Sequence, residues 1–243
     1  MRLLAILVTL LLLPQLAGAS CRVMPFEGVD FSVCAASSGD DIRLFLNGPT
    51  GPFGGFSAVD DKLAKSGQKL GFAMNAGMYQ SDLSPVGLYV EAGKQLSRLI
   101  TSDGPGNFGL LPNGVFCIGD TFSVVETMKF AKTRPTCRYA SQSGPMLVIA
   151  GKEHPLFKPA SDSLHIRNGA GVSADGRTAW FAISDTVVNF DTFARFFRDA
   201  LGAPNALYFD GSISRLYAPE INRSGAGFAI GPIVGLVVNK GNP

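Results

Sequence analysis

The sequence has little charge and no concentrated block of one sign, which argues against two classes of protein. Charged residues make up 16% of the 243 residues, the formal net charge is +2, and no run of Lys or Arg occurs. Binding along a nucleic acid needs such a basic run or patch, so we expect no nucleic-acid partner. Hydrophobic residues make up 46% of the chain, which is enough to build a sizeable core and argues against intrinsic disorder.

Histidine is also scarce, and the spacing that many zinc sites use is missing. Only His154 and His165 are present and no C-x-x-C motif occurs, so a zinc site is the less favoured use of the cysteines. The chain has four of them: Cys21, Cys34, Cys117 and Cys137. An even number of cysteines in an exported chain is typical of disulfides, and four cysteines allow three pairings. We expect Cys21–Cys34 and Cys117–Cys137, because neighbours in sequence close the shortest loops.

The amino-terminal residues have the layout of a secretory signal. Arg2 is followed by an apolar run from Leu3 to Leu13 and then by the small-residue stretch Ala17–Ala19, as in a signal peptide with an A-x-A cleavage site. The run of about 11 residues is shorter than the roughly 20 that span a bilayer. We therefore expect cleavage after Ala19.

This interpretation predicts a signal peptide at 1–19 and a mature domain at 20–243. It also predicts a periplasmic or secreted protein without stable membrane insertion. Lipid attachment at Cys21 stays open as an alternative. It is disfavoured because Gly18 stands where the lipid-attachment signal usually has a large aliphatic residue.

Glycine and proline interrupt the chain often, and the segments between them are mostly short and rich in β-forming residues. There are 29 Gly and 15 Pro, and apolar runs bounded in this way are typical of strands. We predict strands at Phe31–Ala35, Ile42–Leu46, Leu70–Met74, Val86–Val90, Gly114–Ile118, Thr121–Glu126, Pro145–Ile149, Thr178–Ile183, Ala206–Phe209 and Ile233–Val238. Asp175-Gly176 lies between two β-prone runs and indicates a tight hairpin turn.

Two segments have the pattern of helices. In Asn189–Leu201 the phenylalanines and small apolar residues recur at the i, i+3, i+4, i+7 spacing of one buried stripe. Asn189 is a suitable N-cap, and Gly202 ends the segment. The other helix is predicted from Ser57 to about Ser66, with the Ser57 side chain capping the backbone amide of Asp60.

The chain shows no internal repeat, no low-complexity tract and no shift in composition that would mark a linker. The roughly 224 residues after the signal fit one large domain or two small ones. We therefore predict a single α+β domain with a mixed, mostly antiparallel β core and a few packed helices.

Of two motifs that often mark enzymes, one matches only by its letters and the other is absent. Gly104–Gly109 matches G-x-G-x-x-G, but the dinucleotide motif needs a helix to open inside it, and Pro105 and Asn107 prevent that. We predict a loop there. The G-x-S-x-G elbow of many serine hydrolases is absent. A catalytic triad of residues distant in sequence stays open as an alternative, made of Ser143, His165 and Asp210.

Polar residues gather in four groups, each at the end of an apolar run. The groups are Asn75 with Gly77, Ser143-Gly144, Arg167-Asn168 with Asp185 farther on, and Asp210 to Arg215. Polar side chains at strand ends can converge on one cleft while the strands hold them rigid. Each group also has a purely structural interpretation as a turn, a buried hydrogen bond or a surface ion pair.

The order of these groups resembles the phosphodiester glycosidase family. The segments that carry the resemblance are "NAGMY", "SQSGPMLV", "IRNGAGVSADGRTAWFAISD" and "NALYFDGSISRLY", and it extends from about Leu70 to Val238. It implies that the family's Asn-Gly-Gly turn falls on Asn75–Gly77, its Ser-Gly-Pro on Ser143–Pro145, its arginine on Arg167, and its Asp-Gly-Gly-x-Ser loop on Asp210–Ser214. Ala76 and Ser212 stand where the family has glycine, which predicts a narrower pocket.

The resemblance implies hydrolysis of a sugar-1-phosphodiester, with cleavage at the anomeric carbon and a phosphomonoester as leaving group. Asp210 is our candidate nucleophile or base. Asp185 is the candidate second carboxylate, with Glu91 behind it, and His165 is a candidate proton shuttle. The candidate substrate-binding residues are Asn75, Gly77, Ser143, Gly144, Arg167, Asn168, Gly211, Ser212, Ser214 and Arg215, with the arginines suited to phosphate.

We expect no cofactor and no metal ligands, although two aspartates holding a divalent cation stay open. Two other functions also stay open. One is a non-catalytic periplasmic protein that binds a carbohydrate or an envelope polymer. The other is a phosphodiesterase that acts at phosphorus.

Overall fold

The structure, a computed structural model, describes residues 20–210 and 212–241. The predicted signal peptide at 1–19 and the candidate residue Gly211 lie outside the described residues.

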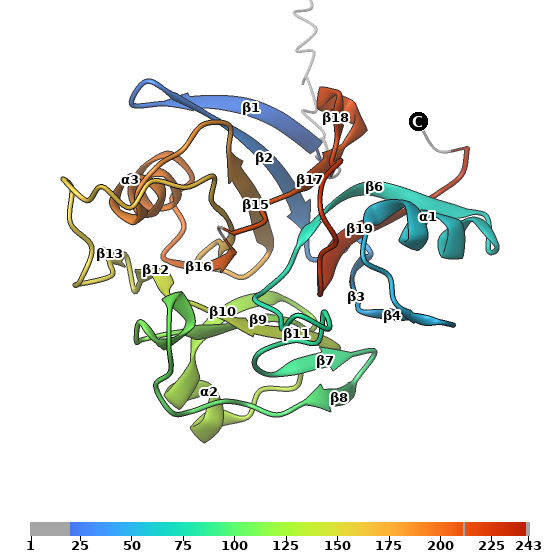
Figure 1. The fold of residues 1–243 in the computed structure, drawn as a ribbon, viewed down its shortest axis with the longest axis horizontal. Coiled ribbons are helices and arrows are strands. Elements are labelled where there is room, and N and C mark those ends of the chain that lie inside the picture. Colours follow the sequence, from blue (N-terminus) through green and yellow to red (C-terminus); the bar gives the residue numbers. More distant parts are fainter. Residues whose placement is uncertain (1–19, 211, 242–243) are drawn as a thin grey trace, which may run out of the picture.

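Three antiparallel sheets make up most of the fold (Figure 1). The largest has the order β1-β2-β15-β14-β16-β12-β13. Its strands are β1 (Ser20–Phe26), β2 (Val29–Ser37), β12 (Met146–Ile149), β13 (Lys152–Glu153), β14 (Asn168–Val172), β15 (Thr178–Ser184) and β16 (Asn205–Asp210). We call it the seven-stranded sheet.

The second sheet has the order β10-β9-β11-β7-β8. Its strands are β7 (Tyr89–Glu91), β8 (Lys94–Ser97), β9 (Gly114–Ile118), β10 (Phe122–Glu126) and β11 (Tyr139–Ser143). The third has the order β18-β17-β6-β19-β3. Its strands are β3 (Ile42–Phe45), β6 (Gln68–Asn75), β17 (Leu216–Ala218), β18 (Arg223–Ser224) and β19 (Ile233–Asn239), and a separate small hairpin pairs β4 (Asn47–Gly48) with β5 (Gly51–Pro52).

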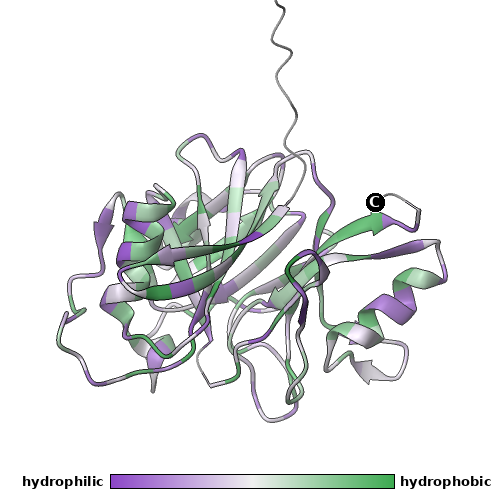
Figure 2. Ribbon diagram, turned by 90° about the horizontal axis from the view of Figure 1, so that it is seen from above, coloured by the Kyte–Doolittle hydropathy of each residue, from purple (hydrophilic) through white to green (hydrophobic). Residues whose placement is uncertain are grey.

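Every pairing between these strands in the described part of the chain is antiparallel. The predicted α+β fold with a mostly antiparallel core is therefore confirmed. In Figure 2 the strand that ends beside the C label, β19, is almost continuously hydrophobic. It lies between β6 and β3, and a run without polar alternation is typical of a strand that is covered on both faces.

The three sheets each turn one face to a common core. Phe72 of β6, Phe116 of β9 and Phe181 of β15 come from the three different sheets. The ring of Phe181 lies 5.4 Å from that of Phe72 and 5.6 Å from that of Phe116, between ring centroids. Because a buried phenylalanine removes a large apolar area from water, this cluster holds the sheets together.

Each sheet has a helix on its outer face (Figure 1). Helix α1 (Phe56–Ala64) packs on the third sheet, α2 (Thr127–Thr133) on the second, and α3 (Phe190–Arg195) on the seven-stranded sheet. A π-helical turn at Phe196–Ala200 continues α3, and a 3-10 turn precedes β9 at Asn107–Gly109 and another precedes β18 at Pro219–Ile221. No helix between Ser20 and Gly241 combines the length and the apolar character needed to cross a bilayer.

The sequence patterns predict most of these elements. Each predicted strand overlaps an observed one, and the hairpin turn at Asp175-Gly176 joins β14 to β15. The phenylalanine stripe is buried against the seven-stranded sheet, and the Asn189 side chain accepts a hydrogen bond from the Thr192 amide at 2.9 Å. Both expectations are confirmed.

The predicted cap of the first helix is wrong. Helix α1 begins at Phe56, its N-cap is Gly55, and no side-chain cap is present. Ser57 therefore lies inside the first turn. The buried Phe56 side chain anchors the helix start, and the N-cap lies two residues earlier than the capping pattern suggested.

Strand β14 has a composition that does not predict a strand, since two of its five residues are glycine. The close packing of its neighbours explains the glycines. A Cβ at Gly169 would lie 2.4 Å from the carbonyl oxygen of Leu207, and one at Gly171 would lie 2.6 Å from a ring carbon of Phe197.

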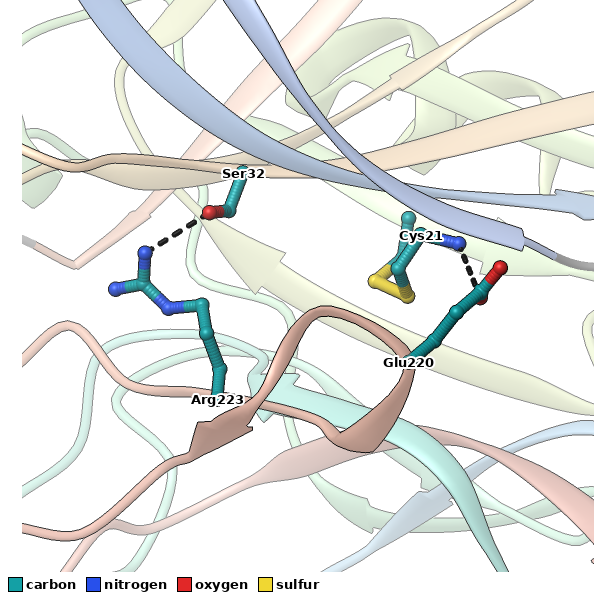
Figure 3. Close-up of a disulfide and its surroundings, with 5 residues drawn as sticks. Cys21, Ser32, Glu220 and Arg223 are labelled. Atoms are coloured by element: carbon teal, nitrogen blue, oxygen red, sulfur yellow. Dashed lines mark hydrogen bonds between the residues drawn. A yellow bond between two sulfur atoms is a disulfide. The ribbon is translucent and has the colours of Figure 1, made fainter.

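Both predicted disulfides are present, Cys21–Cys34 and Cys117–Cys137. The first joins directly opposed residues of β1 and β2, and the Cys21 amide donates to Glu220 at 2.7 Å (Figure 3). Because the sulfur of Cys21 is bonded to that of Cys34, the same atom is not available for a lipid thioether.

Candidate active site

The third sheet and the seven-stranded sheet are joined by two buried asparagines. Asn75 is the last residue of β6 and Asn168 is the first residue of β14, and both side chains are fully buried. The side-chain nitrogen of Asn168 donates to the side-chain oxygen of Asn75 at 2.7 Å and to the backbone carbonyl oxygen of Asn75 at 3.0 Å. Two strand ends from different sheets are therefore locked together by a satisfied polar contact.

The second sheet is tied to both of the others at the same place. The Ser143 hydroxyl, at the end of β11, donates to the carbonyl oxygen of Phe209 at 2.9 Å. The Ser141 hydroxyl donates to the carbonyl oxygen of Ala76 at 2.6 Å. Gly77 has φ +152°, and a Cβ there would lie 2.7 Å from Oγ of Ser141, so the backbone approach requires glycine.

Asp210 lies at this junction, at the end of β16. The register between β14 and β16 shifts here, so that Phe209 and Asp210 together occupy the space opposite one position of β14. A bulge of this kind re-aims the side chain that follows it. The Asp210 amide donates to Oδ1 of Asn168 at 3.0 Å, and its own Oδ1 accepts from the Ser212 amide at 2.9 Å. The Ser214 hydroxyl donates to the Asp210 carbonyl at 2.7 Å and completes the turn.

Asp210 is 8% exposed and is one of the residues that line a cavity of about 580 Å³. Three chain segments line it, and their residues are Met78, Tyr79, Gln80, Val86, Pro105, Gly106, Asn107, Phe108, Asp210, Ser212 and Ile213. Asp210 is the only charged residue in this described lining. The rest of the wall is aromatic, apolar or neutral and polar, a composition typical of small-molecule sites.

Tyr79 contributes a hydroxyl and a ring to this wall. Its hydroxyl donates to the carbonyl oxygen of Ala229 at 3.1 Å. Burial raises the pKa of Tyr79 to about 12, the negative charge of Asp210 adds to this, and the positive charge of Arg215 opposes it. The phenol therefore stays protonated at neutral pH, and it lies within electrostatic range of both charges.

Neither candidate arginine lines the cavity. Arg167 is fully buried, and its guanidinium lies 3.7 Å from the centroid of the Phe190 ring. The Arg215 amide donates to Oδ1 of Asn75 at 2.9 Å, whereas its side chain donates to the Gly225 carbonyl at 2.6 Å and to that of Phe228. Arg215 lines a neighbouring cavity of about 310 Å³.

The Asp185 carboxylate is occupied by two other side chains. Its carboxylate pairs with Arg223 and accepts from the Ser32 hydroxyl at 3.0 Å. Figure 3 shows the Arg223 guanidinium pointing to Ser32, to which it donates at 2.9 Å. Asp185 is not among the residues that line the cavity of Asp210, so its catalytic role stays a prediction.

The remaining candidates, Glu91, His165 and Ser143, are not among the residues that line the cavity. Glu91 accepts from the Tyr89 hydroxyl at 2.9 Å on β7, and burial raises its pKa. His165 is exposed and exchanges two backbone hydrogen bonds with Val188. Within residues 20–210 and 212–241 no hydrogen bond joins Ser143 to His165, as a catalytic triad would require.

Gly144 and Ala76 are both tightly packed, and the role of Gly144 in substrate binding stays a prediction. A Cβ at Gly144 would lie 2.4 Å from Cβ of Asn113, and Ala76 is fully buried. Of the two residues that replace family glycines, only Ser212 lines the cavity. No group of three or more His, Cys, Asp or Glu side chains in the described ranges is arranged to hold a metal ion.

Sequence reasoning missed several residues of the cavity wall. Gly104–Gly109 forms a loop with a short 3-10 turn, as predicted, but this loop places Asn107 and Phe108 beside Asp210. Tyr79 stands in the quoted "NAGMY" segment, so its position after the Asn75 turn was the available signal. Nothing in the sequence indicated that Asn107 lines the cavity, because the fold determines which residues lie next to a loop in space.

A second cavity, of about 520 Å³, lies between β7 and α2. Its wall contains apolar side chains such as Leu88, Leu99 and Phe130, one cation at Arg134, and no carboxylate among the described lining residues. It therefore lacks the acid that hydrolysis of a glycosidic bond requires.

Comparison with known proteins gives relatives for most of the chain. A sequence model of the phosphodiester glycosidase family matches residues 68–236. Uncharacterized protein YigE of Escherichia coli strain K12 is 40% identical over 146 residues, which are 60% of this chain and 57% of that protein. The chain thus spans less than two thirds of the length of this relative.

Two solved structures share the fold. The catalytic domain of zebrafish N-acetylglucosamine-1-phosphodiester alpha-N-acetylglucosaminidase, auto-inhibited by its pro-peptide, superposes with a TM-score of 0.60 at 13% identity, over 90% of this chain and 82% of that one. A hypothetical protein from Synechocystis superposes with a TM-score of 0.60 at 14% identity, over 91% of this chain and 62% of that one. Since the family match covers more than half of the sequence, the chain belongs to the phosphodiester glycosidase family.

Proposed function

We propose that this protein hydrolyses a sugar-1-phosphodiester to free sugar and a phosphomonoester, with Asp210 as the catalytic carboxylate. The observation that carries the proposal is the position of Asp210. Asp210 ends a buried strand, one oxygen of its carboxylate accepts from the Ser212 amide, and the residue lines a cavity of about 580 Å³. That volume lies within the range of small-molecule sites, and family membership supports glycoside chemistry.

The leaving group makes a single carboxylate sufficient. A departing phosphomonoester is a weak base, so it needs little help from a general acid. Asp210 then either attacks the anomeric carbon or activates the water that does so, and its negative charge stabilises the oxocarbenium-like transition state. A backbone amide bonded to one carboxylate oxygen fixes the geometry of this attack.

We place the sugar in the cavity and the phosphate toward Arg215. A phosphodiester anion deep in the cavity would be repelled by Asp210, which is the only charge on the described wall. The charges of Asp210 and Arg215 both act on the pKa of Tyr79, which lines the cavity, and this supports a phosphate position on the Arg215 side of the site. The neutral, aromatic wall suits a sugar ring, and the guanidinium suits phosphate oxygens.

The test is turnover of a panel of sugar-1-phosphodiesters: the methyl esters of glucose-, galactose-, mannose- and N-acetylglucosamine-1-phosphate. We expect free sugar and methyl phosphate from at least one of them. In H₂¹⁸O the methyl phosphate should stay unlabelled, whereas a phosphodiesterase that attacks phosphorus would place the label in it. Asp210→Asn should lower kcat about 100- to 10,000-fold. Asp185→Asn is the matched acid-to-amide comparison: a comparable loss there would support Asp185 as the second catalytic carboxylate.

A non-catalytic carbohydrate- or envelope-polymer-binding protein is the second candidate. The observation that favours it is the single carboxylate of the described wall, because most glycosidases use a pair. Loss of turnover without loss of sugar binding in Asp210→Asn supports the enzyme. Sugar binding by a wild-type protein that turns over no phosphodiester supports the binder.

We also propose that the protein is exported. Two disulfides are typical of oxidising compartments. Expression of the full chain in a bacterial host, followed by fractionation and intact mass measurement, tests this. The mature protein should begin at Ser20 and be absent from the cytoplasm.

A further inference from the structure

Lys and Arg are unevenly distributed in the structure, although no run of them occurs in the sequence. Two segments beside the second sheet are basic: the turn and strand β8 at 92–99, and α2 with the chain that follows it at 127–138. Together they contain six of the 21 Lys and Arg residues and none of the 19 Asp and Glu residues, so the rest of the chain has more acids than bases. The six cations are Lys94, Arg98, Lys129, Lys132, Arg134 and Arg138.

The two basic segments lie next to each other around the cavity of about 520 Å³. The Gly93 amide donates to the Arg138 carbonyl oxygen at 2.7 Å, which joins the turn before β8 to the chain after α2. Both segments line the cavity, one with Gly93 and Leu99 and the other with Phe130 and Arg134. In Figure 1, α2 and β8 lie together at the lower end of the molecule. The fold therefore gathers charges from two separate stretches of sequence around one cavity.

These cations are not used inside the protein. All six residues are exposed, and within the described ranges none of them forms an ion pair with a carboxylate. Like charges that lie close together without acids between them repel one another and give the fold no compensating ion pair. The cluster is therefore suited to a partner of the opposite charge.

The same part of the surface also offers apolar side chains. Met128 of α2 is 58% exposed and Leu96 of β8 is 46% exposed, and the cavity wall includes Leu88 and Leu99. A nucleic acid would need exposed aromatic rings on which its bases could stack, but Phe130, the single aromatic residue of the two segments, is buried. Cations combined with exposed apolar side chains fit the surface of an anionic bilayer instead.

We propose that the basic face, made of the six cations with Leu96, Met128 and the cavity between β7 and α2, docks on a membrane surface that contains anionic phospholipids. The cations attract the lipid phosphates, and the apolar side chains contact the acyl chains. Peripheral attachment of this kind needs no helix that crosses the bilayer. The inference does not depend on the proposed function, because this cavity and that of Asp210 share no described lining residue.

The test is co-sedimentation with two kinds of vesicle, phosphatidylcholine alone and phosphatidylcholine mixed with phosphatidylglycerol. Wild type should bind the mixed vesicles and not the neutral ones, and its binding should weaken as salt is added. The double substitution Lys129→Gln with Lys132→Gln should lower the partition coefficient for the mixed vesicles about 10- to 30-fold. Both residues are exposed on α2, so the loss of their charge leaves the packing of the sheet intact.

A matched control is available on another helix. Lys62 and Lys65 have the same spacing, are exposed, and lie at the end of α1, which covers the third sheet. The double substitution Lys62→Gln with Lys65→Gln removes the same charge from the protein and should change the partition coefficient by less than about 3-fold. All variants have the same amino terminus, so a difference between them cannot come from residues 1–19.

The apolar contact is tested separately. Met128→Ser should lower the partition coefficient at every salt concentration and leave the dependence on salt unchanged, because it removes apolar area and no charge. Thermal unfolding confirms that each variant is folded. Unchanged binding by Met128→Ser would overturn the apolar part of the proposal.

The remaining outcomes decide the docking itself. A loss confined to the Lys129 and Lys132 variant supports the basic face. Equal losses in the two lysine pairs would show an effect of net charge alone and overturn the proposal, as would a wild-type protein that does not bind the mixed vesicles. Tighter binding of wild type to a DNA duplex than to these vesicles would overturn the assignment to a membrane in favour of a nucleic acid.

Discussion

The backbone amide of Asp210 donates to the side-chain oxygen of Asn168 at 3.0 Å. The same oxygen is 3.4 Å from the side-chain nitrogen of Asn75 and 3.4 Å from the Ser214 hydroxyl. One buried amide group therefore sets the position of the candidate catalytic acid relative to β6, a strand of another sheet. The proposed catalytic geometry and the packing of the sheets therefore depend on the same contact.

Asn168→Ala should lower the free energy of unfolding by about 2–4 kcal/mol, because it leaves buried polar groups of Asn75 and Asp210 without their partner. Chemical denaturation measures this. Asn47→Ala, at an exposed position of β4, is the control and should change stability by less than about 0.5 kcal/mol. Equal effects of the two substitutions would contradict a structural role for the asparagine pair.

Most of the fold was predictable because its signals are local. Strands bounded by Gly and Pro, the phenylalanine stripe before Gly202, and cysteines close in sequence each act over a few residues. Strand β14 was missed because its glycines are required by the close packing of Leu207 and Phe197, which are distant in sequence. The start of α1 was misplaced because burial of Phe56 outweighs the capping preference of Ser57.

The site was predictable in part for a similar reason. Polar residues at strand ends gave Asn75, Ser143, Asn168 and Asp210, which the structure brings to one junction. Arg167 and Asn168 are adjacent in sequence yet contact opposite surroundings, Phe190 on one side and Asn75 on the other. The sequence does not say which of two neighbours along an extended chain turns toward the junction of the strand ends.

Gly77→Ala should destabilise the protein by about 2–5 kcal/mol, since it combines a strained backbone angle with overpacking. The angle is φ +152°, and the new Cβ would lie 2.7 Å from Oγ of Ser141. Gly39→Ala is the matched control, because a methyl group added there would have no atom within 4 Å and the φ of Gly39 is not positive. Thermal unfolding compares the two. A stable Gly77→Ala with impaired sugar binding would instead assign Gly77 to direct substrate contact.

The free energy of unfolding should fall on mild acidification, because the buried His154 ring is held in its neutral form. Its Nε2 lies 3.0 Å from the Leu111 carbonyl and its Nδ1 accepts from the Leu156 amide at 3.3 Å, so the neutral ring fits this site. Burial lowers the pKa of His154 below 6.5, with the Leu111 contact opposing. The unfolded chain therefore binds the proton more readily, and the stabilisation present above about pH 6.5 is lost as pH falls through the folded-state pKa.

Denaturation between pH 7.5 and 4.5 measures this for wild type, His154→Gln and the control His165→Gln. The difference in unfolding free energy between wild type and His154→Gln should shrink as the pH falls, while His165→Gln should keep the wild-type dependence on pH through His154. A constant difference for His154→Gln across this range would contradict the assignment.

Arg215 has two roles, since it supplies a charge and also holds the loop at 225–228. Two different substitutions are needed to separate them. If its charge attracts the substrate phosphate, Arg215→Met should raise KM for an active methyl phosphodiester about 10-fold and weaken its dependence on salt. Arg215→Lys should keep the salt dependence, because the charge remains while the fork geometry is lost. Binding of the free sugar should be unchanged in both variants. If KM rises equally in Arg215→Met and Arg215→Lys and both bind the free sugar more weakly, Arg215 acts by holding the loop. The substrate phosphate would then have to be bound by another cation.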